Sequence, residues 1–184
     1  VEVILAVDAS EGDTMEVCDS FAERHFNVKL TSSPIREGKG AAITRGFDLA
    51  EGDLLGYLDG DMSVHPDELW EMTSFLNSGK GWDIVIGSRD HPDAVLVKNQ
   101  SFFRKKIGRI YSRMIRLMFK VDLFDFQCGC KVFHRKIWES ISLYEEGFAF
   151  DTELLVKSAY KGFKIKEVPV SWTNDTNSKV NPFS

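Results

Sequence analysis

Apolar and polar positions along the chain follow two patterns, short aliphatic runs and longer stretches with helical periodicity. Short runs rich in Val, Ile and Leu, bounded by Gly, Asp, Ser or Pro, are typical of buried strands. Such runs occupy residues 1–7, 28–30, 54–58, 83–86, 132–134 and 164–172, the last interrupted by Pro169. The run at 1–7 is nearly continuous and predicts a strand buried on both faces.

Helical periodicity fills most of the chain between these runs. Apolar residues recur every three or four positions in five segments, which predicts helices. These segments are residues 15–26, 38–50, 66–76, 101–119 and 151–160. Residues 90–100 and 125–131 have neither pattern, and we expect loops there. Strands that alternate with helices indicate an α/β domain with a mostly parallel sheet covered by helices on both faces.

Composition is compatible with one soluble domain over residues 1–184. The chain is 43% hydrophobic and 28% charged, and its net charge of −5 gives no general attraction to nucleic acid. The chain has three cysteines, Cys18, Cys128 and Cys130. Their odd number and their spacing match neither a zinc site nor a disulfide framework, which favours a reducing, cytoplasmic compartment. No run reaches the roughly 20 apolar residues of a spanning helix, so we expect any membrane contact to be peripheral.

Polar side chains gather where three of the predicted strands end. Ligands of parallel sheets collect at the carboxyl ends of the strands. The three ends carry Asp8 and Ser10, Asp59 and Asp61, and Ser88 and Arg89.

The acidic pair is the strongest candidate for chemistry. Residues i and i+2 of an extended segment point the same way, roughly 6.5–7 Å apart at Cα. Asp59 and Asp61 can therefore both approach one hard cation such as Mg²⁺, which usually takes only one or two protein carboxylates plus substrate phosphates. The alternative is a solvated acidic turn, and the polar groups at the other strand ends favour the metal site.

Gly38, Lys39 and Gly40 open the second predicted helix. The glycines allow the backbone to approach a ligand closely, and Lys39 offers a cation for phosphate. The spacing is not that of a P-loop, and a helix-starting turn with a solvated lysine is an equal alternative. Asp8 has two readings as well: it accepts hydrogen bonds from a nucleobase or ribose, or it caps the turn that follows.

The predicted helix 101–119 lies in a basic segment, because residues 98–120 contain eight basic residues and no acidic one. It carries an apolar stripe of Phe103, Ile107, Ile110, Met114 and Leu117, and a basic line of Arg109, Arg113, Arg116 and Lys120. One interpretation packs the apolar stripe on the core and leaves the basic face in solvent. The other is an interfacial helix lying on anionic headgroups, or one that brings Arg104 and Lys105 to a substrate phosphate.

Two later segments are ambiguous. The loop 125–131 mixes Asp125 and Lys131 with two cysteines, which we expect to be packing residues because no histidine is placed to activate them. The segment 150–153 is either a helix N-cap with a first-turn acid or the source of a site carboxylate. The four histidines have no metal-ligand spacing.

These motifs, taken in order, resemble the family 2 glycosyltransferases of GT-A (Rossmann-like) fold. Within them the chain resembles the polyprenyl-phosphate sugar transferases, and most closely the dolichyl-phosphate β-glucosyltransferases. The matching segments are residues 7–10, 38–42, 59–63, 87–89, 125–131, 150–155 and 167–170, then Trp172 and the pair 178–179.

The resemblance implies an inverting transfer of a hexose, with glucose favoured, from a nucleoside-diphosphate sugar to a polyprenyl (dolichyl) phosphate. Mg²⁺ or Mn²⁺ is implied on Asp59 and Asp61, and Asp125 is implied as positioner or weak base. The nucleotide sugar is expected at Asp8, Ser10, Gly38, Lys39, Gly40, Asp59 and Arg89. The acceptor phosphate is expected at Arg104, Lys105 and Lys131. A place at the cytoplasmic face of a membrane follows from the lipid acceptor.

Other functions stay open at this point. A GDP-mannose-using dolichyl-phosphate mannose synthase is the nearest alternative. A sugar nucleotidyltransferase requires a glycine-rich loop with a basic residue near the amino terminus, and a non-catalytic membrane-surface module requires only the basic helix. The chain also departs from the family pattern: Val1 already lies in what corresponds to the second strand, and relatives continue beyond Lys179. We therefore expect a fragment that lacks the family's first strand and its carboxyl-terminal membrane-associated region.

Overall fold

The structure, a computed structural model, describes residues 1–10, 12–97 and 102–173, and only the backbone of residues 102–105. These residues form three sheets and six helices. The helices are α1 (Thr14–Arg24), α2 (Lys39–Leu49), α3 (Pro66–Leu76), α4 (Phe102–Phe119), α5 (Arg135–Ser140) and α6 (Phe150–Tyr160). The α/β class expected from the sequence is thus confirmed.

The central sheet has four strands in the order β3-β6-β4-β7. These are β3 (Leu54–Leu58), β6 (Cys130–His134), β4 (Ile84–Ser88) and β7 (Ile165–Pro169). β4 and β7 are parallel, whereas β6 runs antiparallel to both β3 and β4. Because β6 reverses between two neighbours, β3 and β4 are parallel to each other and end at the same edge of the sheet.

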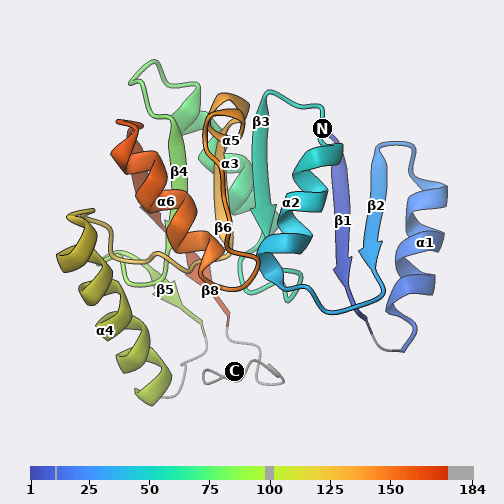
Figure 1. The fold of residues 1–184 in the computed structure, drawn as a ribbon, viewed down its shortest axis with the longest axis horizontal. Coiled ribbons are helices and arrows are strands. Elements are labelled where there is room, and N and C mark those ends of the chain that lie inside the picture. Colours follow the sequence, from blue (N-terminus) through green and yellow to red (C-terminus); the bar gives the residue numbers. More distant parts are fainter. Residues whose placement is uncertain (11, 98–101, 174–184) are drawn as a thin grey trace.

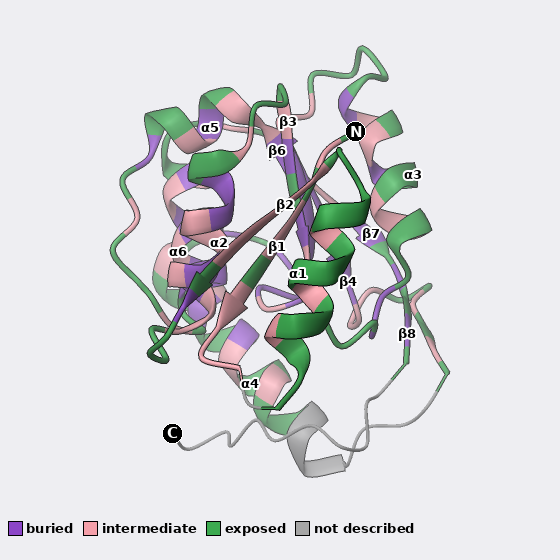
Figure 2. Ribbon diagram, turned by 90° about the vertical axis from the view of Figure 1, so that its right-hand side faces the viewer, coloured by how far each residue is buried: buried purple, intermediate pink, exposed green. Residues whose placement is uncertain are grey.

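Helices cover both faces of this sheet. α2, α5 and α6 lie on one side and α3 on the other (Figures 1 and 2). Consecutive residues of β4 face opposite sides: Ile84 and Ile86 join the core beneath α2, α5 and α6, while Val85 joins the core beneath α3. All three have no exposed surface, as expected for a strand covered on both faces.

The first strand differs from its prediction. β1 (Val3–Asp8) pairs in parallel only with β2 (Val28–Ser33), and the described residues form no ladder between β1 and β3. None of its residues is buried, and Val3 is 42% exposed. The prediction of a strand buried on both faces was therefore wrong for these residues, because β1 lacks a paired neighbour on its second edge.

Two elements, β5 and α5, were not predicted. β5 (Val95–Leu96) and β8 (Ser171–Trp172) form a short parallel ladder, so the segment 90–100 is not entirely a loop. α5 contains only six residues, too few to show helical periodicity. By contrast, α3 begins at Pro66 as predicted, with the His65 ring accepting a hydrogen bond from the Asp67 N–H. No helix in the described part of the chain is long and apolar enough to cross a bilayer.

Candidate active site

The three predicted strand ends lie along one edge of the molecule. Asp8 is the last residue of β1, Asp59 follows β3, and Ser88 ends β4. In Figure 1 β1 and β3 point the same way, toward the lower edge of the view. The polar groups expected at strand ends therefore all follow the carboxyl ends of their strands, two in the central sheet and one in the β1–β2 sheet.

Asp59 is the most connected of them. Its Oδ1 lies 2.9 Å from the Lys39 ammonium, which lies 2.9 Å from Asp151 Oδ2 on its other side. The Asp59 side chain is 41% exposed, whereas the Asp151 side chain is 1% exposed. Lys39 therefore bridges an accessible carboxylate and a buried one, and the alternative of a solvated lysine is wrong.

Asp151 organises the buried half of this cluster. Its Oδ1 accepts hydrogen bonds from the Lys131 ammonium and the Tyr57 hydroxyl, and Lys131 also donates to the Cys128 carbonyl at 2.6 Å. Burial acts to raise the pKa of Asp151, but the neighbouring ammonium groups of Lys131 and Lys39 lower it to about 2. The helix N-cap is Ala149, without a side-chain cap, so the expected N-cap is wrong, whereas the expected first-turn acid is present as Asp151 and Glu153.

Gly129 makes room for the Asp59 carboxylate. The Asp59 N–H donates to the Gly129 carbonyl at 3.0 Å. A Cβ on residue 129 would lie 1.9 Å from Asp59 Oδ2 and 2.1 Å from its Cγ, far inside van der Waals contact. The absence of a side chain at this position therefore allows the carboxylate its observed place.

Asp61 completes the acidic pair. It is exposed, and its Oδ1 accepts a hydrogen bond from the Ser63 N–H at 2.9 Å. The part of the chain that the structure describes holds no group of three or more His, Cys, Asp or Glu arranged for a metal. Two accessible carboxylates are a fitting donor set for Mg²⁺ or Mn²⁺, which complete their coordination with water and substrate phosphates.

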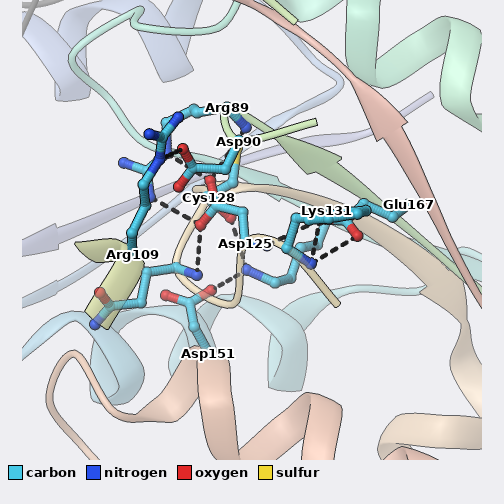
Figure 3. A network of polar contacts seen from close by, with 10 residues as sticks. Arg89, Asp90, Arg109, Asp125, Cys128, Lys131, Asp151 and Glu167 are labelled. Atoms are coloured by element: carbon cyan, nitrogen blue, oxygen red, sulfur yellow. Dashed lines mark hydrogen bonds and ion pairs between the residues drawn. The ribbon is translucent and has the colours of Figure 1, made fainter. Parts of the chain in front are cut away.

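A second charged cluster follows β4. The Arg89 guanidinium donates to both carboxylate oxygens of Asp125. Its Nε lies 2.6 Å from Oδ2, and one terminal nitrogen lies 2.9 Å from Oδ1 (Figure 3). The backbone N–H groups of Arg89 and Gln127 also donate to Asp125. Burial acts to raise the pKa of Asp125, and the Arg89 charge outweighs it and lowers the pKa.

The loop that carries Asp125 is fixed from β7. The Glu167 carboxylate accepts the N–H groups of Phe124 and Asp125 at 2.9–3.1 Å. Desolvation by burial raises the pKa of Glu167. The Asp125 position is thus set by contacts from two strands, β4 and β7.

The Asp8 carboxylate is hydrogen-bonded to the loop before α2. Its oxygens accept the N–H groups of Glu37 and Gly38 at 3.1 and 2.8 Å. Among the described residues, the Asp8 side chain accepts no backbone hydrogen bond from the turn that follows it, and its expected contact with the nucleotide stays a prediction. Asp8 holds the segment that presents Lys39.

The two glycines beside Lys39 make a close contact within the protein. Gly38 has a φ of 115°. A Cβ on Gly38 or Gly40 would lie 2.5 Å from the carbonyl oxygens of Glu146 or Glu145. The close approach expected for a ligand is here an approach to the 145–147 segment of the chain.

The remaining predicted site residues divide into three groups. Ser10 follows β1, and its hydroxyl has no hydrogen-bond partner among the described residues. Lys131 has no exposed side-chain surface, so its expected phosphate contact stays a prediction beside the observed pairing with Asp151. The side chains of Phe103, Arg104 and Lys105, and the pair Ser178 and Lys179, lie outside the described residues.

Cys128 and Cys130 are buried packing residues, as expected. Burial raises the pKa of the Cys128 thiol to about 12 and raises that of Cys130 as well. Thiols with raised pKa values are poor nucleophiles at neutral pH.

The apolar stripe of α4 faces solvent. Ile107, Ile110, Met114 and Leu117 are 47, 59, 47 and 76% exposed. The interpretation that packs this stripe on the core is therefore wrong. Arg109 ties the helix to the site edge, because its Nε lies 2.9 Å from Asp90 Oδ1, one residue after Arg89 (Figure 3).

Sequence reasoning did not assign Tyr57, Gly129 or Glu167 to the site, and it left Asp151 undecided. Tyr57 reads as one more apolar residue of a strand, and Gly129 as one more glycine of a loop. For Asp151 the sequence did offer a signal, an acid in the matching segment 150–155. Its role depends on Lys39 and Lys131, which only the fold brings to it.

Comparison with known proteins gives relatives over nearly the whole chain. Glycosyltransferase AglD of Haloferax volcanii is 34% identical over 182 residues, which cover 98% of this chain and 29% of that protein. Dolichyl-phosphate beta-glucosyltransferase ALG5C of Trichomonas vaginalis is 30% identical (97% of this chain, 55% of the relative), and the Homo sapiens dolichyl-phosphate beta-glucosyltransferase is 28% identical (99% and 59%). The chain thus spans less than two thirds of the length of each.

Solved structures agree on the fold. Glucosyl-3-phosphoglycerate synthase of Mycobacterium tuberculosis superposes with a TM-score of 0.69 at 19% identity, over 95% of this chain and 62% of that one. This similarity confirms the expected GT-A fold. The model of the family "Glycosyl transferase family 2" matches residues 1–142. The chain therefore belongs to glycosyl transferase family 2.

Proposed function

We propose that the protein transfers a hexose, with glucose favoured, from a UDP-sugar to a polyprenyl (dolichyl-type) phosphate. The observation that carries this proposal is the accessible pair Asp59 and Asp61 after β3, with the Arg89–Asp125 ion pair after the parallel strand β4. Relatives named dolichyl-phosphate beta-glucosyltransferase support the acceptor and the sugar. A structural neighbour crystallised with Mn²⁺ and UDP-glucose is consistent with the donor.

Asp59 and Asp61 would hold Mg²⁺ or Mn²⁺. When bound, the ion neutralises charge on the leaving diphosphate. The carboxylates supply hard oxygen ligands and leave coordination positions for the donor's phosphate oxygens. Asp8 fixes the loop that carries Lys39, and so keeps a cation at this edge.

The reaction is an inverting substitution at the anomeric carbon. An acceptor phosphate oxygen forms the new bond to C1 as the bond from C1 to the β-phosphate oxygen breaks, and the nucleoside diphosphate leaves. The acceptor is already an oxyanion, so it needs little help from a base. All four observed donors to Asp125 hold it as a carboxylate, and we assign it the role of positioning Arg89 rather than of taking a proton.

Arg89 is the cation best placed to meet a phosphate. Its side chain is 29% exposed although two of its nitrogens are bound to Asp125. A fork held on one side by a carboxylate presents its remaining N–H groups in a fixed direction, which suits a phosphate oxygen. Electrostatic stabilisation of this kind works best when the donors are already oriented.

The lipid acceptor implies contact with a membrane, and we propose that this contact is peripheral, at the cytoplasmic face. The exposed stripe of α4, flanked by arginines, is suited to an anionic bilayer surface. Through the Arg109–Asp90 ion pair the same helix adjoins the strand ends. A lipid phosphate at the headgroup level would thereby lie near the proposed site.

Turnover by the full-length protein tests the proposal. With polyprenyl phosphate and Mn²⁺, release of UDP from UDP-glucose should exceed release of GDP from GDP-mannose. Asp61→Asn should lower turnover by about 100-fold or more, because a metal ligand contributes several kcal/mol to the transition state. Asp48→Asn, a matched loss of charge at the end of α2, is the control. A preference for GDP-mannose would favour the mannose synthase, and an unchanged Asp61→Asn rate would overturn the metal role.

A further inference from the structure

Lys39 lies where two carboxylates of different accessibility meet. Its ammonium is 2.9 Å from Asp59 Oδ1 and 2.9 Å from Asp151 Oδ2, and its side chain is 16% exposed. The ammonium also lies 5.6 Å from the centre of the Tyr57 ring. These contacts place a positive charge directly on the first carboxylate of the acidic pair.

The two ends of this bridge are held very differently. Asp151 is fixed from behind by Lys131 and by the Tyr57 hydroxyl, in a region with almost no exposure. Asp59 is 41% exposed and rests on the backbone of Gly129. Solvent weakens an ion pair whose carboxylate is accessible, whereas breaking a buried pair leaves an uncompensated buried charge. Lys39 is therefore anchored on Asp151 and only lightly held on Asp59.

The charges of this cluster are balanced before any metal binds. Lys39 and Lys131 together neutralise Asp59 and Asp151. A divalent cation on Asp59 would stand next to the Lys39 ammonium, and like charges a few Å apart repel even at high dielectric. A divalent cation on Asp59 would therefore weaken the contact between Lys39 and that carboxylate.

We propose that Lys39 is the resident counter-ion of Asp59, exchanged for the divalent cation when the donor binds and then directed to the donor's diphosphate while it stays on Asp151. The inference rests on the proposed function, since it assumes that Asp59 takes a metal. Lys39 thus has two partners one after the other: Asp59 before the donor binds, and the donor's diphosphate afterwards. A lysine that contacts only the phosphates, away from Asp59, would have little effect on the protein's affinity for the metal alone.

Binding of Mn²⁺ without nucleotide separates these roles. The loss of the free-ion electron paramagnetic resonance signal measures bound Mn²⁺ directly. Lys39→Met should bind Mn²⁺ roughly tenfold more tightly than the wild type, as expected when one unit charge a few Å from a divalent ion is removed. With Mn²⁺ present, the same variant should bind UDP about tenfold more weakly, because the diphosphate loses a cation.

The variant is expected to fold, because Asp151 keeps Lys131 and Tyr57 as partners. Lys39→Gln is the second variant and should tighten Mn²⁺ binding in the same direction. Lys39→Arg keeps the charge and should bind Mn²⁺ as the wild type does. Lys29→Met removes an equivalent charge from the distant pair with Glu2 and Glu51, and is the matched control for net charge.

The outcomes distinguish the inference from the function on which it rests. Nucleotide-free Mn²⁺ affinity that is unchanged or weaker in both Lys39→Met and Lys39→Gln would overturn the exchange, and Asp59 would remain a metal ligand. Equal Mn²⁺ binding by the wild type and Asp59→Asn would overturn the metal site and the exchange together. Tightening in Lys39→Met and Lys39→Gln, with none in Lys29→Met, is the expected result.

Discussion

Single residues of the site depend on neighbours that are distant in the sequence. Asp59 meets Lys39 from α2, Gly129 from the loop before β6, and through Lys39 it meets Asp151 from α6. An acidic pair after a strand predicts a carboxylate site by itself. The groups that hold each carboxylate come from other elements, so their identity depends on the fold.

Gly129→Ala tests how closely the Asp59 carboxylate is held. The new methyl group would overlap that carboxylate, the end of a side chain that can move, so the carboxylate shifts while the backbone remains in place. We expect turnover to fall by about 100-fold, the effect of misplacing a reacting group by about 1 Å. The melting temperature should change little. Gly108→Ala, where a Cβ meets nothing within 4 Å, is the control, and full activity of Gly129→Ala would contradict the assigned contact.

At the scale of elements, α4 is the clearest departure from globular packing. Its 18 residues place an apolar stripe in solvent, although a helix of this kind usually buries that stripe in the core. Periodicity alone could not decide between the two, because a stripe that faces the core and one that faces a membrane have the same spacing. The partner of an apolar stripe is decided by which elements pack on it.

Leu117→Glu tests the membrane role of α4. Leu117 is 76% exposed, so the substitution should leave the fold intact while placing a negative charge on the contacting face. Binding to vesicles that contain anionic lipid should weaken by about 10–100-fold, the value of withdrawing one large apolar side chain. Val17→Glu on α1, at 58% exposure, is the matched control in the same flotation assay. Unchanged binding of Leu117→Glu would remove α4 from the membrane contact.

The whole molecule is held together in part by the buried charge cluster. Asp151 of α6 joins Lys39 of α2, Tyr57 of β3 and Lys131 of β6. These four side chains come from four different elements, between residues 39 and 151. Removing the charge on Asp151 would therefore weaken contacts across the domain.

Acid should reveal this contribution. The pKa of Asp151 is lowered in the folded state to about 2 from 3.8, so its stabilisation is present above about pH 4 and is lost as pH falls through 2. The shift corresponds to about 2 kcal/mol. Denaturant unfolding from pH 5 to pH 2 should show a loss for the wild type that exceeds the loss for Asp151→Asn by this amount. Parallel pH profiles would show that Asp151 is not held as a carboxylate.

The sequence by itself determined the α/β class, most element boundaries and the positions of the acidic pair. These depend on local spacing: aliphatic runs between turn residues, helical periodicity, and Pro66 at a helix start. The family resemblance supplied the GT-A fold, which the structural similarity confirmed.

The tertiary structure decided what the sequence could not, namely which groups meet. It made β6 antiparallel, left β1 half exposed, turned the stripe of α4 to solvent and brought Lys39 and Lys131 to Asp151. Local spacing carries no information on long-range partners. The role of a charged side chain is set by the burial and the opposite charges that the packed chain provides.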